Sequence, residues 1–167
     1  MSMLIREAVP EDAKEMLELL KIIGGESDNL TFGSEGVGLT VEEEVEYIEA
    51  VLQSKTSILL VAIKNGKIVG QCNLCGALSG RLKHRRELGI AVIKSEWDSQ
   101  IGTKLMEQAI NFAKEVHVEV ISLEVRSDNQ RAIHLYEKFD FQKIGAFKNY
   151  LKIGEKRVDF DLMNLYL

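Results

Sequence analysis

The spacing of apolar residues changes repeatedly along this chain between the two-residue period of a strand and the 3.6-residue period of a helix. This alternation strongly constrains the fold, because each segment can bury its apolar side only as one kind of element. The order β-α-α-β-β-β-α-β-α-β-β predicts an α/β (α+β) chain. We expect strands at residues 3–8, 57–64, 67–78, 87–93, 120–125, 143–153 and 157–167, and helices at residues 11–23, 41–53, 102–114 and 129–139.

Short motifs mark the ends of several of these elements. Pro10 fits the first turn of a helix, and the glycine pair that follows its last apolar residues predicts its end. Thr40 and Glu43 have the spacing of a capping box, which predicts the start of the second helix. The Asn-Gly pair at 65–66 predicts a tight turn between two paired strands. The five glycines of residues 24–39 follow no period, so we expect a mobile loop over the surface.

Composition limits the classes of function. A chain of 167 residues with 46% hydrophobic and 28% charged residues is long enough for one domain with a substantial core. A net charge of -5 argues against a nucleic-acid or anionic-membrane partner, because both require a basic surface. No apolar run approaches the roughly 20 residues of a membrane span, and the start MSMLIREAVPEDA lacks the pattern of a signal peptide. We therefore expect a cytoplasmic protein.

The two cysteines, Cys72 and Cys75, form a CxxC motif that invites a metal or redox interpretation. In a strand at 67–78, however, residues three apart point to opposite faces, so the two sulfurs could not bind one ion. No second CxxC motif and no nearby histidine completes a set of four ligands. We therefore predict two packed thiols and no metal site.

A polar turn with one glycine leads into the third helix in the segment SEWDSQIGTKLMEQAINFAK, residues 95–114. Such a turn directs free backbone N–H groups and the positive end of the helix dipole toward the space above it. This geometry suits an anion such as a phosphate. Short glycine motifs also recur by accident, so an ordinary strand-to-helix turn stays the alternative at this point.

Two segments resemble the GCN5-related N-acetyltransferase (GNAT) superfamily. Residues 89–113, GIAVIKSEWDSQIGTKLMEQAINFA, are similar to the strand, glycine turn and helix of the family's acetyl-CoA motif. Residues 121–141, ISLEVRSDNQRAIHLYEKFDF, follow the family pattern LEVR-x-x-N-x-x-A-I-x-L-Y-x-x-x-G-F more closely. The resemblance implies a GNAT-like fold with a mixed, mostly antiparallel central sheet, formed by a single N-acetyltransferase domain over residues 1–167.

The first segment departs from the family pattern at two positions. Trp97 stands where the family has Gln or Arg, and Gln100 stands where it has its first glycine, so only Gly102 remains. The side chain of Gln100 disfavours a positive φ and limits the approach of a phosphate. Asp98 brings a negative charge to the same turn, and we expect its carboxylate to face outward or to cap a backbone N–H.

The resemblance implies acetyl-CoA as cosubstrate. The backbone of residues 90–92 would pair with the pantetheine arm, and residues 98–103 would hold the pyrophosphate. Asn129 would hydrogen-bond the cofactor, a role that can coexist with capping the next helix. The expected cofactor-binding residues are Ile90, Ala91, Val92, Asp98, Ser99, Gln100, Ile101, Gly102, Thr103, Asn129 and Tyr136.

Acetyl transfer to an amine needs a neutral amine and a proton for the departing thiolate. Tyr136 matches the family's general acid, whose phenol is protonated at neutral pH; packing in the core is the alternative role of its ring. Two glutamates are candidates for the base, directly or through water: Glu87, two residues before Gly89, and Glu124 of LEVR. We favour Glu87.

The predicted function is acetyl transfer from acetyl-CoA to a primary amine of a small molecule, by direct attack in a ternary complex. No cysteine lies in the two cofactor motifs, which argues against an acyl-enzyme. Glu26, Asp28 and Glu35 could attract a cationic amine, which favours a small acceptor. LEVR suggests instead an N-terminal protein or peptide acetyltransferase, and the altered phosphate turn leaves open a non-catalytic acyl-CoA-binding regulator. A homodimer is compatible with each of these functions.

Overall fold

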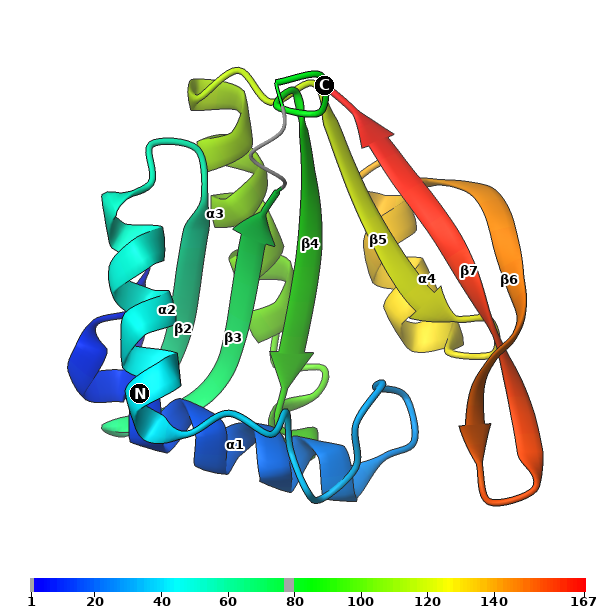
Figure 1. The fold of residues 1–167 in the computed structure, drawn as a ribbon, viewed down its shortest axis with the longest axis horizontal. Coiled ribbons are helices and arrows are strands. Elements are labelled where there is room, and N and C mark those ends of the chain that lie inside the picture. Colours follow the sequence, from blue (N-terminus) through cyan, green and yellow to red (C-terminus); the bar gives the residue numbers. More distant parts are fainter. Residues whose placement is uncertain (1, 77–79) are drawn as a thin grey trace.

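The computed structural model describes residues 2–76 and 80–167, whose helices and strands follow the order predicted from the sequence (Figure 1). Among the described residues, no helix combines the length and the apolar character needed to cross a membrane. The strands are β1 Met3–Glu7, β2 Ile58–Lys64, β3 Lys67–Cys75, β4 Arg85–Val92, β5 Val120–Arg126, β6 Gln142–Ile153 and β7 Lys156–Tyr166, and the α-helices are α1 Ala13–Glu26, α2 Val41–Gln53, α3 Ile101–Glu115 and α4 Gln130–Lys138.

The seven strands form one sheet in the order β1-β2-β3-β4-β5-β7-β6. Only β4 and β5 are parallel; every other neighbouring pair is antiparallel. Helices α1 and α2 lie on one face of the sheet, and α3 and α4 lie on the other (Figure 1). This mixed, mostly antiparallel sheet between helices confirms the predicted fold class.

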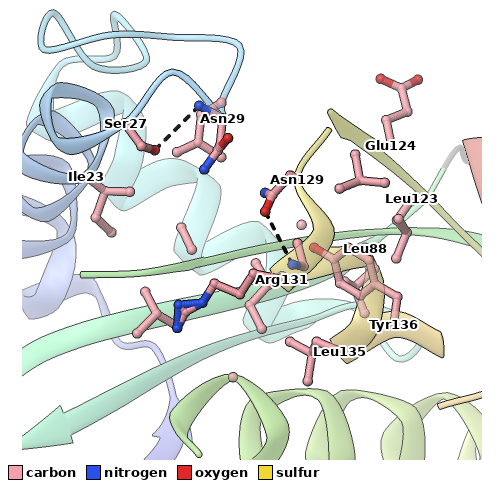
Figure 2. A pocket seen from close by; sticks show the side chains of 18 of the residues that line it. Ile23, Ser27, Asn29, Leu88, Leu123, Glu124, Asn129, Arg131, Leu135 and Tyr136 are labelled. Carbon is pink, nitrogen blue, oxygen red and sulfur yellow. Dashed lines mark hydrogen bonds between the residues drawn. The ribbon is translucent and has the colours of Figure 1, made fainter. Parts of the chain in front are cut away.

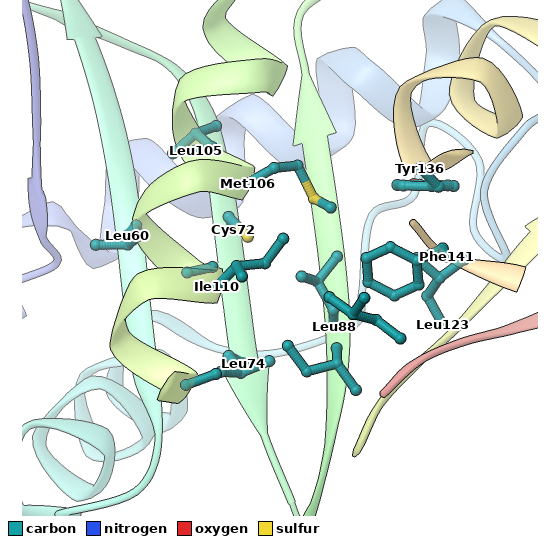
Figure 3. Close-up of a cluster of buried hydrophobic side chains, with 14 of the residues drawn as sticks. Leu60, Cys72, Leu74, Leu88, Leu105, Met106, Ile110, Leu123, Tyr136 and Phe141 are labelled. Carbon is teal, nitrogen blue, oxygen red and sulfur yellow. The ribbon is translucent and has the colours of Figure 1, made fainter. Parts of the chain in front are cut away.

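The larger apolar cluster fills the space between the sheet and helices α3 and α4. Leu105, Met106 and Ile110 of α3 pack with Leu74 of β3 and Leu88 of β4 (Figure 3). A second cluster packs α1 and α2 against β2 on the opposite face. Burying apolar side chains on both faces stabilises the central strands at about 25 cal/mol per Å² of area removed from water, so the sheet is a firm support for a site.

The cysteines occupy opposite faces of β3, as predicted. Cys72 is fully buried in the cluster beneath α3, whereas Cys75 packs on the α1 and α2 side. There its sulfur lies 3.1 Å from the hydroxyl of Tyr47 on α2. Burial raises the pKa of the Cys72 thiol to about 12, so this thiol is a packing group. The strand ends at Cys75, and residues 77–78, which the sequence placed in it, lie outside the described residues.

The capping box of α2 forms as predicted, because the Thr40 hydroxyl accepts from the Glu43 N–H and the Glu43 carboxylate accepts from the Thr40 N–H. The predicted end of the first helix is wrong, since α1 continues through its glycine pair to Glu26. A Cβ atom at Gly24 would lie 2.1 Å from the carbonyl oxygen of Gly33. Glycine is therefore needed here so that the following loop can lie against the helix.

Candidate active site

A cleft opens where β4 and β5 separate. These parallel strands pair only from Arg85–Val120 to Glu87–Ser122, and beyond this point they diverge (Figure 1). A cavity of about 950 Å³ lies in the gap, lined by β4, β5, the start of α3, α4 and the loop after α1 (Figure 2). This volume falls in the range of small-molecule and cofactor sites.

One wall of the cavity is the open edge of β4. Ile90, Ala91 and Val92 line the cavity and pair on their other side with β3. Apart from the Val92 carbonyl, which accepts from the Trp97 indole, their backbone groups on the cavity side pair with none of the described strands, because β5 has already diverged. Such an edge can hydrogen-bond an extended ligand chain in the way a strand would, which fits the role predicted for these residues.

The start of α3 forms the end of the cavity that suits an anion. Asp98 and residues 100–103, for which the sequence predicts binding of the pyrophosphate, line it. Ser99 is the exception among the predicted residues: its hydroxyl donates to the Glu96 carbonyl and it does not line the cavity. A Cβ atom at Gly102 would lie 3.2 Å from Leu135, so the glycine lets α4 approach α3 closely.

Gln100 adopts the left-handed conformation that its side chain disfavours, with φ 65°, and Asp98 does so as well, with φ 61°. Gln100 thus adopts a positive φ although its side chain disfavours it. The turn keeps the backbone path that glycine would take, at a cost of about 1 kcal/mol per such residue. The departure from the family motif thus places a side chain at a turn position whose φ favours glycine.

Trp97 and Arg131 form the mouth of the cavity beside this turn. The Trp97 indole N–H donates to the Val92 carbonyl at 2.9 Å, which fixes the ring. The Arg131 guanidinium lies 4.4 Å from the centre of that ring and 2.8 Å from an Asp98 carboxylate oxygen. The Asp98 side chain is 90% exposed, so it faces outward as predicted. Arg131 was not predicted, because no motif links residue 131 to residues 97–98.

Tyr136 enters the cavity from α4. Its ring packs 5.9 Å from the Phe141 ring and is only 7% exposed, and the residue also lines the cavity. Core packing and the catalytic role are therefore compatible. Burial raises the pKa of Tyr136, so the phenol is a proton donor over the whole neutral range.

Asn129 lies at the start of α4 and also lines the cavity. Its side-chain oxygen accepts a hydrogen bond from the Ala132 N–H at 3.3 Å, which makes it the N-cap of the helix. Figure 2 shows this bond between the Asn129 side chain and the start of the helix. Both predicted roles are therefore sterically compatible.

Glu87 and Glu124 lie on the opposite side of the cleft from Tyr136. Glu87 pairs with Ser122, two residues before Glu124, so both carboxylates are on one face of the sheet. In Figure 2, Glu124 and Leu123 extend in opposite directions from β5, with Tyr136 on the side of Leu123. Both glutamates are exposed and line the cavity. Sequence reasoning missed Tyr150 of β6, whose hydroxyl donates to the Glu124 carboxylate at 2.7 Å.

The loop after α1 reaches the cavity through apolar and amide side chains, including Asn29 and Phe32. The carboxylates predicted to attract an amine do not line it. Glu26 accepts from the Lys94 N–H at 2.8 Å, and Glu35 accepts from the Gly33 N–H at 2.8 Å. Asp28 accepts through its carbonyl from Arg126 at 3.0 Å, which ties the loop to β5.

This chain belongs to the acetyltransferase (GNAT) family, whose model matches residues 28–141. An acetyltransferase of the GNAT family from Streptococcus pneumoniae has the same fold, with 33% identity, a TM-score of 0.95 and 99% of each chain covered. A structure from Salmonella typhimurium that contains its cofactor acetyl-CoA shares the fold at 18% identity, with a TM-score of 0.87 and 100% and 95% of the two chains covered.

Two curated relatives are similar over shorter spans. The first, from Bacillus subtilis, is provisionally named a ribosomal protein bS18-alanine N-acetyltransferase, with 30% identity over 62% of this chain and 66% of its own length. The second is an N-alpha-acetyltransferase of Sulfurisphaera tokodaii, with 35% identity over 44% of this chain and 45% of its own length. The chain thus spans less than two thirds of either relative's length.

Proposed function

We propose that this chain transfers the acetyl group of acetyl-CoA to a primary amine by direct attack in a ternary complex. The observation that carries this proposal is the cleft between β4 and β5, which is lined from both faces of the sheet. Tyr136 and the start of α3 approach it from one face, and Glu87 and Glu124 approach it from the other. Two substrates can therefore meet in the gap from opposite sides.

The cofactor side is formed by groups that suit acetyl-CoA. The edge of residues 90–92 would bind the pantetheine arm through backbone groups other than the Val92 carbonyl, which already accepts from Trp97. The N–H groups of Asp98 and residues 100–103 would bind the pyrophosphate, and Asn129 would add a hydrogen bond. Acetyl-CoA, when bound, supplies the acetyl group as a thioester. Neither Cys72 nor Cys75 lines the cavity, which supports direct transfer without an acyl-enzyme.

Two proton movements complete the reaction. Glu87 or Glu124, directly or through water, takes a proton from the amine as the new C–N bond forms. Tyr136 donates its phenolic proton to the sulfur as the C–S bond breaks, and solvent restores it. This donor role distinguishes an enzyme from an acyl-CoA-binding regulator, which would need no acid at that place.

The α-amine at the N-terminus of a polypeptide is the acceptor class that we favour. Of the acidic loop residues that suggested a small cationic amine, Glu26 and Glu35 bind backbone N–H groups, and neither they nor Asp28 line the cavity. The sequence relatives named above are N-terminal or protein-alanine acetyltransferases. A small-molecule amine stays the second candidate, because a volume of about 950 Å³ also accommodates one beside the cofactor.

The experiment is an acceptor panel with acetyl-CoA, in which free thiol is measured. The panel contains peptides with free N-termini, the same peptides with blocked N-termini and an internal lysine, and polyamines and aminoglycosides. We expect thiol release only with free N-termini. Turnover of polyamines or aminoglycosides alone would replace the peptide acceptor by a small molecule. Binding of acetyl-CoA without turnover of any amine would favour the regulator.

A further inference from the structure

We propose that Tyr150 is a positioning residue that fixes the Glu124 carboxylate on the side of the cleft from which the amine would approach, the acceptor side. This inference rests on the proposed function, because it assigns Glu124 a role toward the amine. Three observations support it: the hydrogen bond from Tyr150 to Glu124, the bulge in β6 that includes Tyr150, and the packing of the Tyr150 ring against two other aromatic rings.

A β-bulge directs Tyr150 toward β5. Phe147 pairs with Phe160, and the next pair is Leu151 with Val158, so three residues of β6 lie opposite one residue of β7. Asn149 within the bulge has φ 54°, and its N–H donates to the Asp159 carboxylate at 2.8 Å. Bulges next to active sites commonly re-aim a side chain, and this one turns Tyr150 across β7.

The ring of Tyr150 is held between two other aromatic rings. The Phe147 ring stacks on it at 5.2 Å, and the Phe160 ring packs against it at 4.9 Å. Such aromatic contacts restrict the two torsions of the side chain. The hydroxyl is thus presented to Glu124 from a fixed ring.

The hydroxyl makes a charge-assisted hydrogen bond of 2.7 Å to one Glu124 oxygen. The negative charge of Glu87, the other candidate base, also raises the pKa of Tyr150. The hydrogen bond to Glu124, burial and both negative charges raise the pKa of Tyr150, so the phenol is a donor at every neutral pH. One oxygen of Glu124 is therefore engaged, and the carboxylate has a defined direction toward the cleft.

The first test is kinetic and compares Tyr150→Phe with Tyr166→Phe. Tyr150→Phe keeps the ring stack and removes the hydroxyl, so we expect kcat to fall about tenfold with acetyl-CoA affinity unchanged. The hydroxyl of Tyr166 accepts from Asn164 at 3.1 Å, away from the two glutamates, and Tyr166→Phe should keep wild-type kcat. An unchanged kcat in Tyr150→Phe would overturn the proposal.

A double-mutant cycle separates positioning from a merely structural role. If Tyr150 acts through Glu124, Tyr150→Phe should lower kcat no further in a Glu124→Gln background. A tenfold loss that persists in that background would show that the hydroxyl acts elsewhere, and it would overturn the proposal.

The second test needs no acceptor and so separates this inference from the proposed function. Tyrosinate absorbance near 295 nm is followed between about pH 9 and 11, with circular dichroism to confirm that the protein stays folded. Because Glu124 raises the pKa of Tyr150, Glu124→Gln should ionise more tyrosine than the wild type in this range. The difference should vanish when Tyr150→Phe is added. Identical titrations of wild type and Glu124→Gln would contradict the pairing whether or not an acceptor is known.

Discussion

Tyr136→Phe is expected to lower kcat by about 100-fold, the usual scale for loss of a general acid. The substitution keeps the ring that packs against Phe141 and removes only the hydroxyl. Because the proton moves only as the thioester breaks, acetyl-CoA affinity and the acceptor KM should change little. Thiol release with the best acceptor measures kcat, and calorimetry measures acetyl-CoA binding.

The melting temperature controls for damage to the core. The Tyr136 ring belongs to the cluster beneath α3 and α4, and Phe preserves its packing, so we expect a shift below about 3 °C. A variant that retains more than about half of the wild-type kcat, under conditions where chemistry limits the rate, would remove Tyr136 from the mechanism.

Gly24→Ala is expected to destabilise the protein by about 2 kcal/mol, because the new Cβ atom overlaps a backbone oxygen that cannot rotate away. The overlap is with Gly33 at 2.1 Å, so the loop that carries Asn29 and Phe32 into the cavity must move. We therefore expect a fall of about 5 °C in the melting temperature and a higher acceptor KM. Thermal unfolding and steady-state kinetics measure these two effects.

Gly25→Ala is the matched control, because it adds the same methyl group one residue further along the same helix. Its Cβ atom would lie 3.4 Å from Ser34, which is ordinary contact. Alanine also favours the helix over glycine, so this variant should gain about 0.5 kcal/mol. Equal stability of the two alanine variants would contradict the close packing of the loop against α1.

The order of the helices and strands was predictable because it depends on local periodicity and on short motifs. The capping box joins Thr40 to Glu43, three residues away, and the Asn-Gly pair at 65–66 forms a tight turn. The structure contains both of these local motifs. The prediction that the glycine pair ends α1 was wrong because this pair serves a tertiary contact and not a local one. Its packing partner, Gly33, is brought there by the path of the loop, which no local pattern encodes.

The same distinction applies to the candidate site. Residues carried by the two family motifs, among them Asn129 and Tyr136, do line one cavity. Tyr150 and Arg131 were missed because their partners are distant in sequence: Glu124 is 26 residues from Tyr150. The proximity of Tyr150 to Glu124 depends on the strand order β5-β7-β6 and on the β6 bulge, which follow from tertiary packing. The proximity of Arg131 to Trp97 and Asp98 depends on the packing of α4 beside the start of α3.

Amide NMR of the full chain during an acetyl-CoA titration tests most directly whether the gap between β4 and β5 holds acetyl-CoA. We expect the largest shift changes at residues 90–92 and 98–103 and at Asn129, because their backbone groups line the gap or the turn beside it. The β1 strand, at the far edge of the sheet, should change little. Saturating acetyl-CoA that leaves residues 90–92 and 98–103 unperturbed would contradict the account.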